Sequence, residues 1–189
     1  MHAMRTTLFC LLVLLSSSTY GTENSSFSIP PLVVDMPTGG DWQVMKKTQF
    51  GVVFKREEPD NRGYSIAKAD VFRIHSSEDP AVFLAEVKET VKALLQAPNT
   101  ILVGTAYTPT SERGYPCVRV RARMDVSVPA NSTEEAFVFS KQMRILLCRQ
   151  PGATPLGFMA AFSYTSPSAA EPFESEAEKF ARNVRLQAK

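Results

Sequence analysis

The clearest pattern in the chain is a strict alternation of apolar and polar residues from Cys117 to Val128. Its apolar members are Val118, Val120, Ala122, Met124, Val126 and Val128, and its polar members are Arg119, Arg121, Arg123 and Asp125. A period of two over this length predicts a β-strand with one buried face.

A second apolar-rich segment, Phe137 to Cys148, follows the turn formers of residues 129–134 and is expected to return as an antiparallel strand. With a turn symmetric about residues 132 and 133, Val118 faces Leu147, Val120 faces Ile145 and Ala122 faces Met143, so the apolar face is continuous. The same register places Cys117 opposite Cys148, within reach of a disulfide. A slip of one residue would put the two cysteines on opposite faces, so the register and the disulfide depend on each other.

Other segments complete the predicted pattern. We expect a hairpin of residues 49–56 and 64–74, with Phe54 opposite Tyr64 and Val52 opposite Ile66. Further strands are expected at residues 100–106 and 157–165, with a loop at residues 108–114.

Two helices are predicted. The first begins at Asp79 and Pro80, because an aspartate caps free amides and a proline fits the first helical position, and it ends near Ala97. The second opens at residues 166–168 and carries an apolar stripe of Phe173, Ala177, Phe180 and Val184. The element order predicts an α+β fold, an antiparallel sheet of about five to seven strands packed with two main helices.

The N-terminus has the order of a secretory signal peptide: Arg5, then an apolar run, then small residues up to Gly21. We therefore expect residues 1–21 to be a cleaved signal peptide, 22–31 a flexible leader and 32–189 a single domain, periplasmic or secreted, with no membrane span after cleavage. Cys10 would leave with the signal, so Cys117 and Cys148 remain as a pair, and a disulfide suits an oxidising compartment.

The segment Pro37 to Trp42 (Pro-Thr-Gly-Gly-Asp-Trp), the middle helix, the long hairpin and the terminal segment Phe180 to Leu186 together resemble the PsbP-like fold family. This fold is shared by a photosystem extrinsic subunit, a yeast Ran-binding import factor and assorted exported bacterial proteins. The resemblance implies a PsbP-like α+β domain with a non-enzymatic binding or assembly role. It carries over no functional residue.

The candidate binding residues are Arg119, Arg121 and Arg123 on the polar face of the alternating strand, with Arg144 opposite Arg121. Like charges in directly opposite positions cost stability, so an anion is expected near them. One interpretation is a binding strip for a carboxylate, a phosphate or an acidic partner, because arginine pairs with such groups in bidentate fashion. The alternative is that water or the acidic residues of the last helix cover the strip, namely Glu171, Glu174, Glu176 and Glu178.

Charge and motifs limit the remaining function classes. The net charge is +2, too small to predict nucleic-acid binding. His75 is the only histidine left after cleavage, which excludes a multi-histidine metal site, and no nucleophile elbow, phosphate loop or dinucleotide fingerprint occurs.

The sequence therefore predicts an exported, non-enzymatic binding or accessory protein of the cell envelope, with an envelope protein as partner and no cofactor or metal. A small-ligand or carbohydrate-binding protein, or a hydrolase with an unfamiliar carboxylate site, is the alternative. The oligomeric state stays open.

Overall fold

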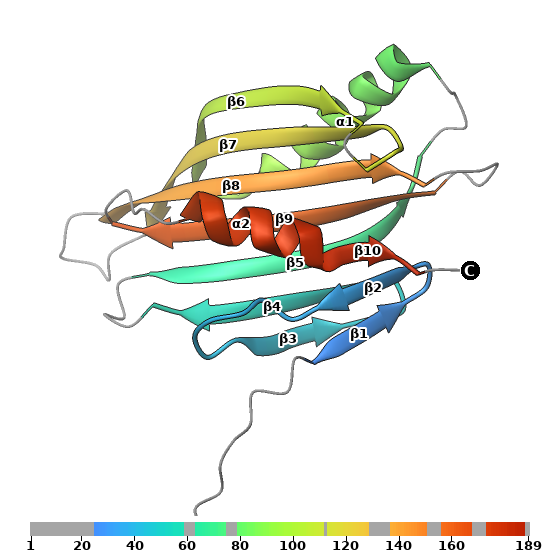
Figure 1. Cartoon of the computed structure of the whole chain (residues 1–189). Coiled ribbons are helices and arrows are strands. Elements are labelled where there is room, and N and C mark those ends of the chain that lie inside the picture. Colours follow the sequence, from blue (N-terminus) through green and yellow to red (C-terminus); the bar gives the residue numbers. More distant parts are fainter. Residues whose placement is uncertain are drawn as a thin grey trace, which may run out of the picture.

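A large antiparallel sheet dominates the computed structural model, which describes residues 25–58, 63–74, 79–111, 113–128, 137–150, 156–167 and 173–187 (Figure 1). Within these residues seven strands lie in the order β3-β4-β5-β9-β8-β7-β6. Their bounds are β3 Gln43–Lys47, β4 Gly51–Glu57, β5 Tyr64–Arg73, β6 Thr100–Thr110, β7 Cys117–Val128, β8 Phe137–Arg149 and β9 Leu156–Ser166.

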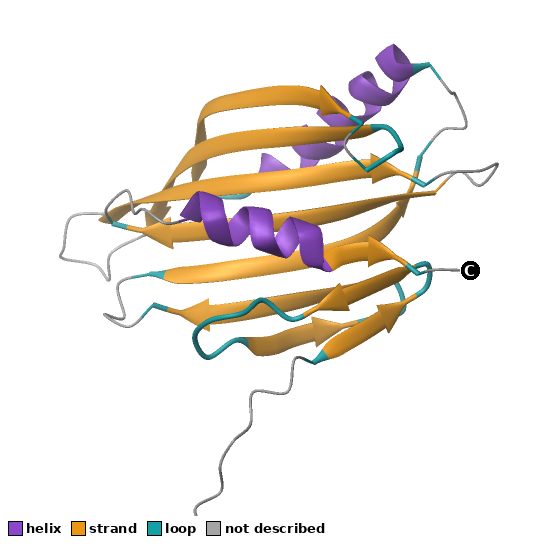
Figure 2. Cartoon of the chain, viewed as in Figure 1, coloured by secondary structure: helices purple, strands orange, loops and turns teal. Residues whose placement is uncertain are grey.

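Three further strands, β1 (Ser26–Ile29), β2 (Leu32–Asp35) and β10 (Val184–Leu186), form a small sheet in the order β1-β2-β10. The helix α2 (Phe173–Asn183) precedes β10 and lies with the small sheet on one face of the large sheet. The helix α1 (Pro80–Leu95) lies on the other face (Figures 1 and 2). The predicted α+β class, with an antiparallel sheet and two helices, is confirmed.

The β7–β8 hairpin has the predicted register. Val118 pairs with Leu147, Val120 with Ile145 and Ala122 with Met143. Cys117 and Cys148 lie opposite each other, with their Cα atoms 4.0 Å apart, and form a disulfide.

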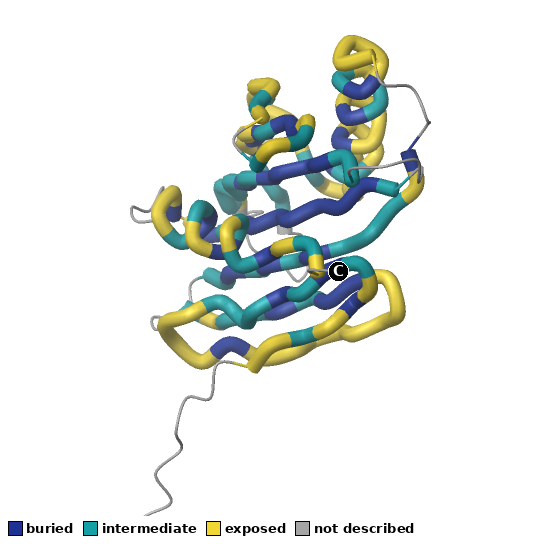
Figure 3. Tube along the Cα trace, turned by 45° about the vertical axis from the view of Figure 1, so that its right-hand side comes forward, coloured by how far each residue is buried: buried dark blue, intermediate teal, exposed yellow. Residues whose placement is uncertain are grey.

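Because side chains alternate along each strand, the large sheet has a separate apolar core on each face. The core between α1 and the sheet contains Val120, Ile145 and, from the helix, Val91. The core between α2 and the sheet contains Phe54, Phe162 and, from the helix, Phe180. The buried positions accordingly concentrate in the middle strands (Figure 3). Arg119, Arg121 and Arg123 alternate with the residues beneath α1, so they lie on the α2 face.

The start of α1 is as the sequence predicts. Pro80 is its first residue, and the backbone N–H of Ala81 donates to Oδ1 of Asp79 at 2.8 Å. The helix ends at Leu95, before Pro98, and buries Phe83 and Val87 on the sheet. No helix among the residues described is both long and apolar enough to cross a membrane.

The predicted register of the β4–β5 hairpin is wrong. Phe54 pairs with Ala67 and Val52 with Ala69, whereas Tyr64 pairs with Glu57. The actual register places two alanines beside Phe54 and Val52, and these small residues leave room for the layer above. Phe54 uses this room to contact the rings of Phe27 and Phe180, at centroid distances of 5.3 and 6.3 Å.

Three predicted boundaries also change. The leader expected at residues 22–31 is wrong from Ser26 onward, because Ser26–Ile29 pairs with β2 as strand β1. The expected loop at residues 108–114 begins later, since β6 continues through Pro109 to Thr110, and an edge strand tolerates a proline. Val184 is buried as predicted, but as the first residue of β10 rather than in the helix. The expected signal peptide lies outside the described residues.

Replacing Cys117 and Cys148 together by alanine should lower the free energy of unfolding by about 3 to 4 kcal/mol, because their disulfide closes a loop between positions 31 residues apart. Urea unfolding followed by circular dichroism measures this difference. A reducing agent should destabilise the wild type comparably and leave the double variant unchanged. Equal urea midpoints for the oxidised and reduced wild type would contradict the pairing.

Candidate functional site

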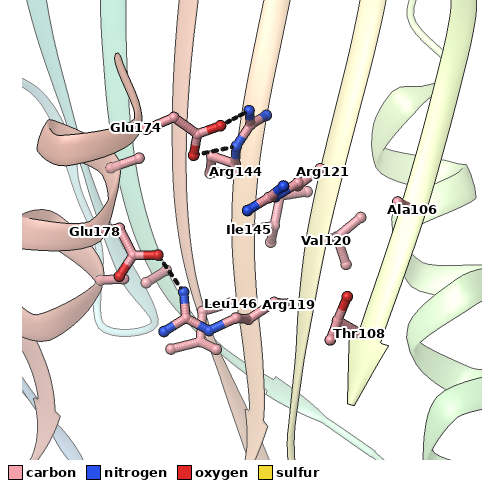
Figure 4. A pocket seen from close by; sticks show the side chains of 13 residues that line it. Ala106, Thr108, Arg119, Val120, Arg121, Arg144, Ile145, Leu146, Glu174 and Glu178 are labelled. Carbon is pink, nitrogen blue, oxygen red and sulfur yellow. Dashed lines mark hydrogen bonds and ion pairs between the residues drawn. The ribbon is translucent and has the colours of Figure 1, made fainter. Parts of the chain in front are cut away.

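The alternation of β7 and the register with β8 bring the candidate arginines to one face. Arg121 and Arg144 are directly opposite each other, Arg119 lies two positions along β7 toward the disulfide, and Arg123 lies two positions the other way. The helix α2 passes over β8 and β9 on this face, so its acidic side chains lie next to the arginines (Figures 1 and 4).

Two of the four arginines have carboxylate partners on α2. The guanidinium of Arg144 forms a bidentate pair with Glu174, in which Nε donates to Oε2 at 2.9 Å and Nη2 donates to Oε1. The same guanidinium lies 5.0 Å from the centroid of the Phe173 ring. Arg119 donates from Nη1 to Oε1 of Glu178 at 2.5 Å. Part of the expected covering by the last helix is therefore real.

Glu176 of α2 does not take part in this covering. Glu176 points to a different arginine, Arg56 on β4, whose Nη2 lies 3.0 Å from Oε2 of Glu176. Arg56 also donates to Glu58 and lies over the ring of Trp42, at 5.0 Å from its centroid. Glu171 lies outside the described residues.

Arg121 makes no hydrogen bond or ion pair with any residue in the described part of the chain, and its side chain is exposed. Figure 4 shows it between the Arg144–Glu174 pair and the Arg119–Glu178 pair. Arg123, also exposed, likewise has no ion-pair partner among those residues. Among the described residues, the site thus combines two arginines in ion pairs with two that form none.

A cavity of about 260 Å³ lies between α2 and the strands β8, β7 and β6 (Figure 4). Its space comes from small side chains, which are Ala177 and Ala181 on α2, Ala160 on β9 and Ala106 on β6. A second hollow of about 440 Å³ continues over β7 and β6. The two hollows share Ala106, Arg121 and Arg144, so Arg121 lies where they meet.

The electrostatics of the site favour negative charge. The hydrogen bonds from Arg144 hold the pKa of Glu174 below its usual range, against the opposing effect of burial, and the charges of Arg144 and Arg121 lower it further. Glu174 is therefore ionised at neutral pH. An additional carboxylate or phosphate that entered the cavity would meet the planar donor group of Arg121, which suits bidentate pairing.

Sequence reasoning located the four arginines but missed the walls of the cavity. Ala106 and Thr108 come from a segment that was only partly predicted as strand, and the alanines of α2 gave no chemical signal. Two alanines four positions apart on a helix, beside an arginine-rich strand, are the pattern that points to such a space.

Two other sequence expectations concern the histidine and possible metal ligands. His75 lies outside the described residues. In the part of the chain that the structure covers, no three histidine, cysteine or acidic side chains are grouped so that they could hold a metal ion.

Comparisons with known proteins give no family assignment: no family model matches the chain, and no curated protein matches it. Among solved structures, a protein from Bacteroides thetaiotaomicron VPI-5482 is 17% identical over 88% of this chain, with a TM-score of 0.42. A mutant of the protein Mog1 is 8% identical, covers 87% of this chain and 96% of its own, and has a TM-score of 0.45. Human StAR-related lipid transfer protein 5 is 11% identical over 75% of this chain and 83% of its own, with a TM-score of 0.33.

The match to the Bacteroides protein spans only 50% of that chain. All three TM-scores lie below 0.5, so these similarities define neither a shared fold nor a shared function. The PsbP-like resemblance stays a prediction from the sequence.

Replacing Glu174 by glutamine should destabilise the protein at neutral pH by about 0.2 to 1 kcal/mol, the range for exposed ion pairs, because 55% of the Glu174 side chain is exposed. The folded-state pKa of Glu174 is lowered from 4.5, so its stabilising contribution is present above that value and is lost as the pH falls through the folded-state pKa. Urea unfolding at a series of pH values should therefore show the gap between wild type and variant narrowing toward acid. Ser175→Ala, at the next exposed position of α2, is the control. A gap that stayed constant or widened at acid pH would contradict the pairing.

Proposed function

We propose that the protein is an exported, non-enzymatic binding protein of the cell envelope that recognises an acidic segment of a partner protein through the arginine-lined cavity. The observation that carries the proposal is Arg121, an exposed arginine without a counter-ion among the described residues, directly opposite a second arginine at the mouth of a cavity.

Charge balance supports a negatively charged ligand. Arg121 and Arg144 are directly opposite each other on the neighbouring strands β7 and β8, an arrangement that is unfavourable without nearby negative charge. Glu174 neutralises Arg144, and Glu178 neutralises Arg119. The charge of Arg121 remains for a ligand, and a carboxylate that bound there would join a row of carboxylates already held by α2.

The shape of the site favours a chain segment over a compact small molecule. The cavity beside α2, at about 260 Å³, lies below the range typical of small-molecule pockets, roughly 300 to 1,000 Å³. It is also continuous with the second hollow over β6, so the whole surface is elongated. An extended peptide can follow such a surface and place several acidic side chains along it.

The carboxylates at the site favour binding over hydrolysis. General acid–base catalysis needs a carboxyl group that is free to exchange a proton at working pH, often one with a raised pKa. Here Glu174 has a lowered pKa and is held by two donors of Arg144. Glu178 is held by Arg119.

Export is supported by the disulfide and by the N-terminal sequence. A Cys117–Cys148 bond persists in oxidising compartments such as the periplasm or the extracellular space. The basic, apolar and small-residue order of residues 1–21 is typical of a signal peptide.

Reversing the charge at Arg121 should weaken the binding of acidic peptides. We expect a fluorescein-labelled oligoglutamate peptide to bind the wild type in a salt-dependent manner, and Arg121→Glu to weaken this binding by about tenfold or more, since a hydrogen bond to a charged group contributes about 1.5 to 3 kcal/mol. Fluorescence anisotropy measures the dissociation constants. We choose Arg121 rather than Arg144, because reversing Arg144 would also repel Glu174 and disturb α2.

The matched control is Arg73→Glu, which makes the same change of charge at an exposed position of β5, three strands away from β7. It should bind like the wild type. The same three proteins, used for affinity capture from the envelope fraction of the source organism, identify the partner. Equal binding by all three proteins would exclude the cavity as the recognition site.

A further inference from the structure

The strand β6 forms one edge of the large sheet and differs in chemistry from the opposite edge. It is 11 residues long and contains no charged residue. Three consecutive apolar residues on it are exposed, with 66% of Ile101, 50% of Leu102 and 51% of Val103 accessible to solvent. A long, uncharged edge with exposed apolar side chains is a site where another strand can pair.

The opposite edge, β3, has the features that prevent such pairing. It is only 5 residues long, carries Lys46 and Lys47, and is interrupted by an irregularity after Val44. Lysines and short length are common means of protecting an edge strand. One edge of the sheet is therefore protected and the other is not. This contrast indicates that β6 is specifically available for pairing with another strand.

β6 also carries two irregular positions, which define the segment that can pair. A bulge lies between Leu102 and Gly104, and Pro109 lacks a backbone donor. Between them, Gly104 to Thr108 pair regularly with β7 on one side. Alternate backbone groups of such a strand point away from its neighbour, so this segment offers hydrogen-bonding groups to an added strand.

Arg121 and Arg123 of β7 lie next to β6, and only small residues of β6 separate them from the edge of the sheet. Arg121 is directly opposite Ala106, and Arg123 is directly opposite Gly104. A methyl group and a hydrogen atom leave the space above β6 open, which is the second hollow of about 440 Å³. The guanidinium groups can therefore extend over β6 toward side chains on an added strand.

From this arrangement we infer that β6 accepts an extended strand of the partner, whose acidic side chains on the α2-facing side meet Arg121 and Arg123. The inference rests on the proposed function and adds the mode of binding, which is backbone pairing at an edge combined with charge recognition. Alternate residues of the added strand point to the same face, so an acidic residue at every second position is the pattern that fits.

The same observations argue against a second copy of this chain as the occupant. Pairing of two β6 strands would bring Arg121 and Arg123 of both copies close to the interface, either on the same face of the joined sheet or on opposite faces. In either case β6 itself supplies no acidic residue to meet them. An acidic partner strand satisfies both the backbone and the arginines.

The test uses a peptide of alternating threonine and glutamate with the length of β6, acetylated and amidated at its ends. Two matched peptides separate the two contributions. The first has glutamine in place of glutamate, so it can form backbone hydrogen bonds but carries no negative charge. The second keeps the glutamates but has N-methyl groups on the backbone amides along both edges of the peptide strand, so these amides cannot donate hydrogen bonds to β6. We expect the parent peptide to bind, and each altered peptide to bind at least about tenfold more weakly.

Hydrogen exchange locates the binding. Added pairing should slow the exchange of backbone amides within Gly104–Thr108 when the parent peptide is present, and β3 should be unaffected. Sedimentation of the free protein should show no dimer that involves β6.

The possible failures are distinguishable. If the N-methylated peptide binds as well as the parent and the amides of β6 exchange as before, strand addition is wrong while the proposed acidic recognition stands. The same conclusion follows if only the flexible oligoglutamate peptide binds. If neither acidic peptide binds the wild type, the proposed function itself fails. A dimer joined through β6 would replace the acidic partner by a second copy.

Discussion

The pairing register of β7 and β8 is the constraint on which the rest of this structure depends. Side chains alternate between the two faces of a strand, so this register decides at once which residues lie beneath α1 and which lie beneath α2. It sends the valines of β7 to one core and the arginines to the other face. It also brings Cys117 and Cys148 together, and their disulfide fixes the register covalently.

The glutamates of α2 pair with arginines at two places on the α2 face, which are Arg56 on β4 and the arginines of β7 and β8. Its aromatic residues Phe173 and Phe180 contact Phe162 of β9, at centroid distances of 5.7 and 6.3 Å, and hold the helix on the sheet. At the C-terminal end of the helix, Arg113 donates to the carbonyl oxygens of Ala181 and Val184, the second at 2.6 Å. With the helix fixed in this way, Glu174 and Glu178 form one wall of the cavity, and Arg121 lies at its mouth without an ion-pair partner among the described residues.

The parts of the fold predicted correctly are those with a strong local pattern. The alternation of Cys117 to Val128 and the Asp79–Pro80 helix start each follow from backbone geometry. The β4–β5 register could not be obtained in the same way, because both possible registers pair apolar residues. The choice is made by packing of Phe54 against Phe27 and Phe180, which are distant in sequence. Strand β3 was missed because all five of its residues are exposed and show no alternation.

The candidate site was partly predictable for a similar reason. The hairpin alone predicted the grouping of Arg119, Arg121, Arg123 and Arg144. It did not predict which glutamate of α2 pairs with which arginine. Which glutamate meets which arginine depends on where α2 crosses the sheet, and this placement sends Glu176 to Arg56 and leaves Arg121 without an ion-pair partner in the described part of the chain.

Nuclear Overhauser contacts between backbone protons of β7 and β8 test the central register most directly. The structure predicts contacts that join Val120 to Ile145, Arg121 to Arg144 and Ala122 to Met143. Contacts between like protons, Hα with Hα or HN with HN, that are displaced by one residue, such as Val120 to Arg144, would contradict the account, because the arginines would then leave the face of α2.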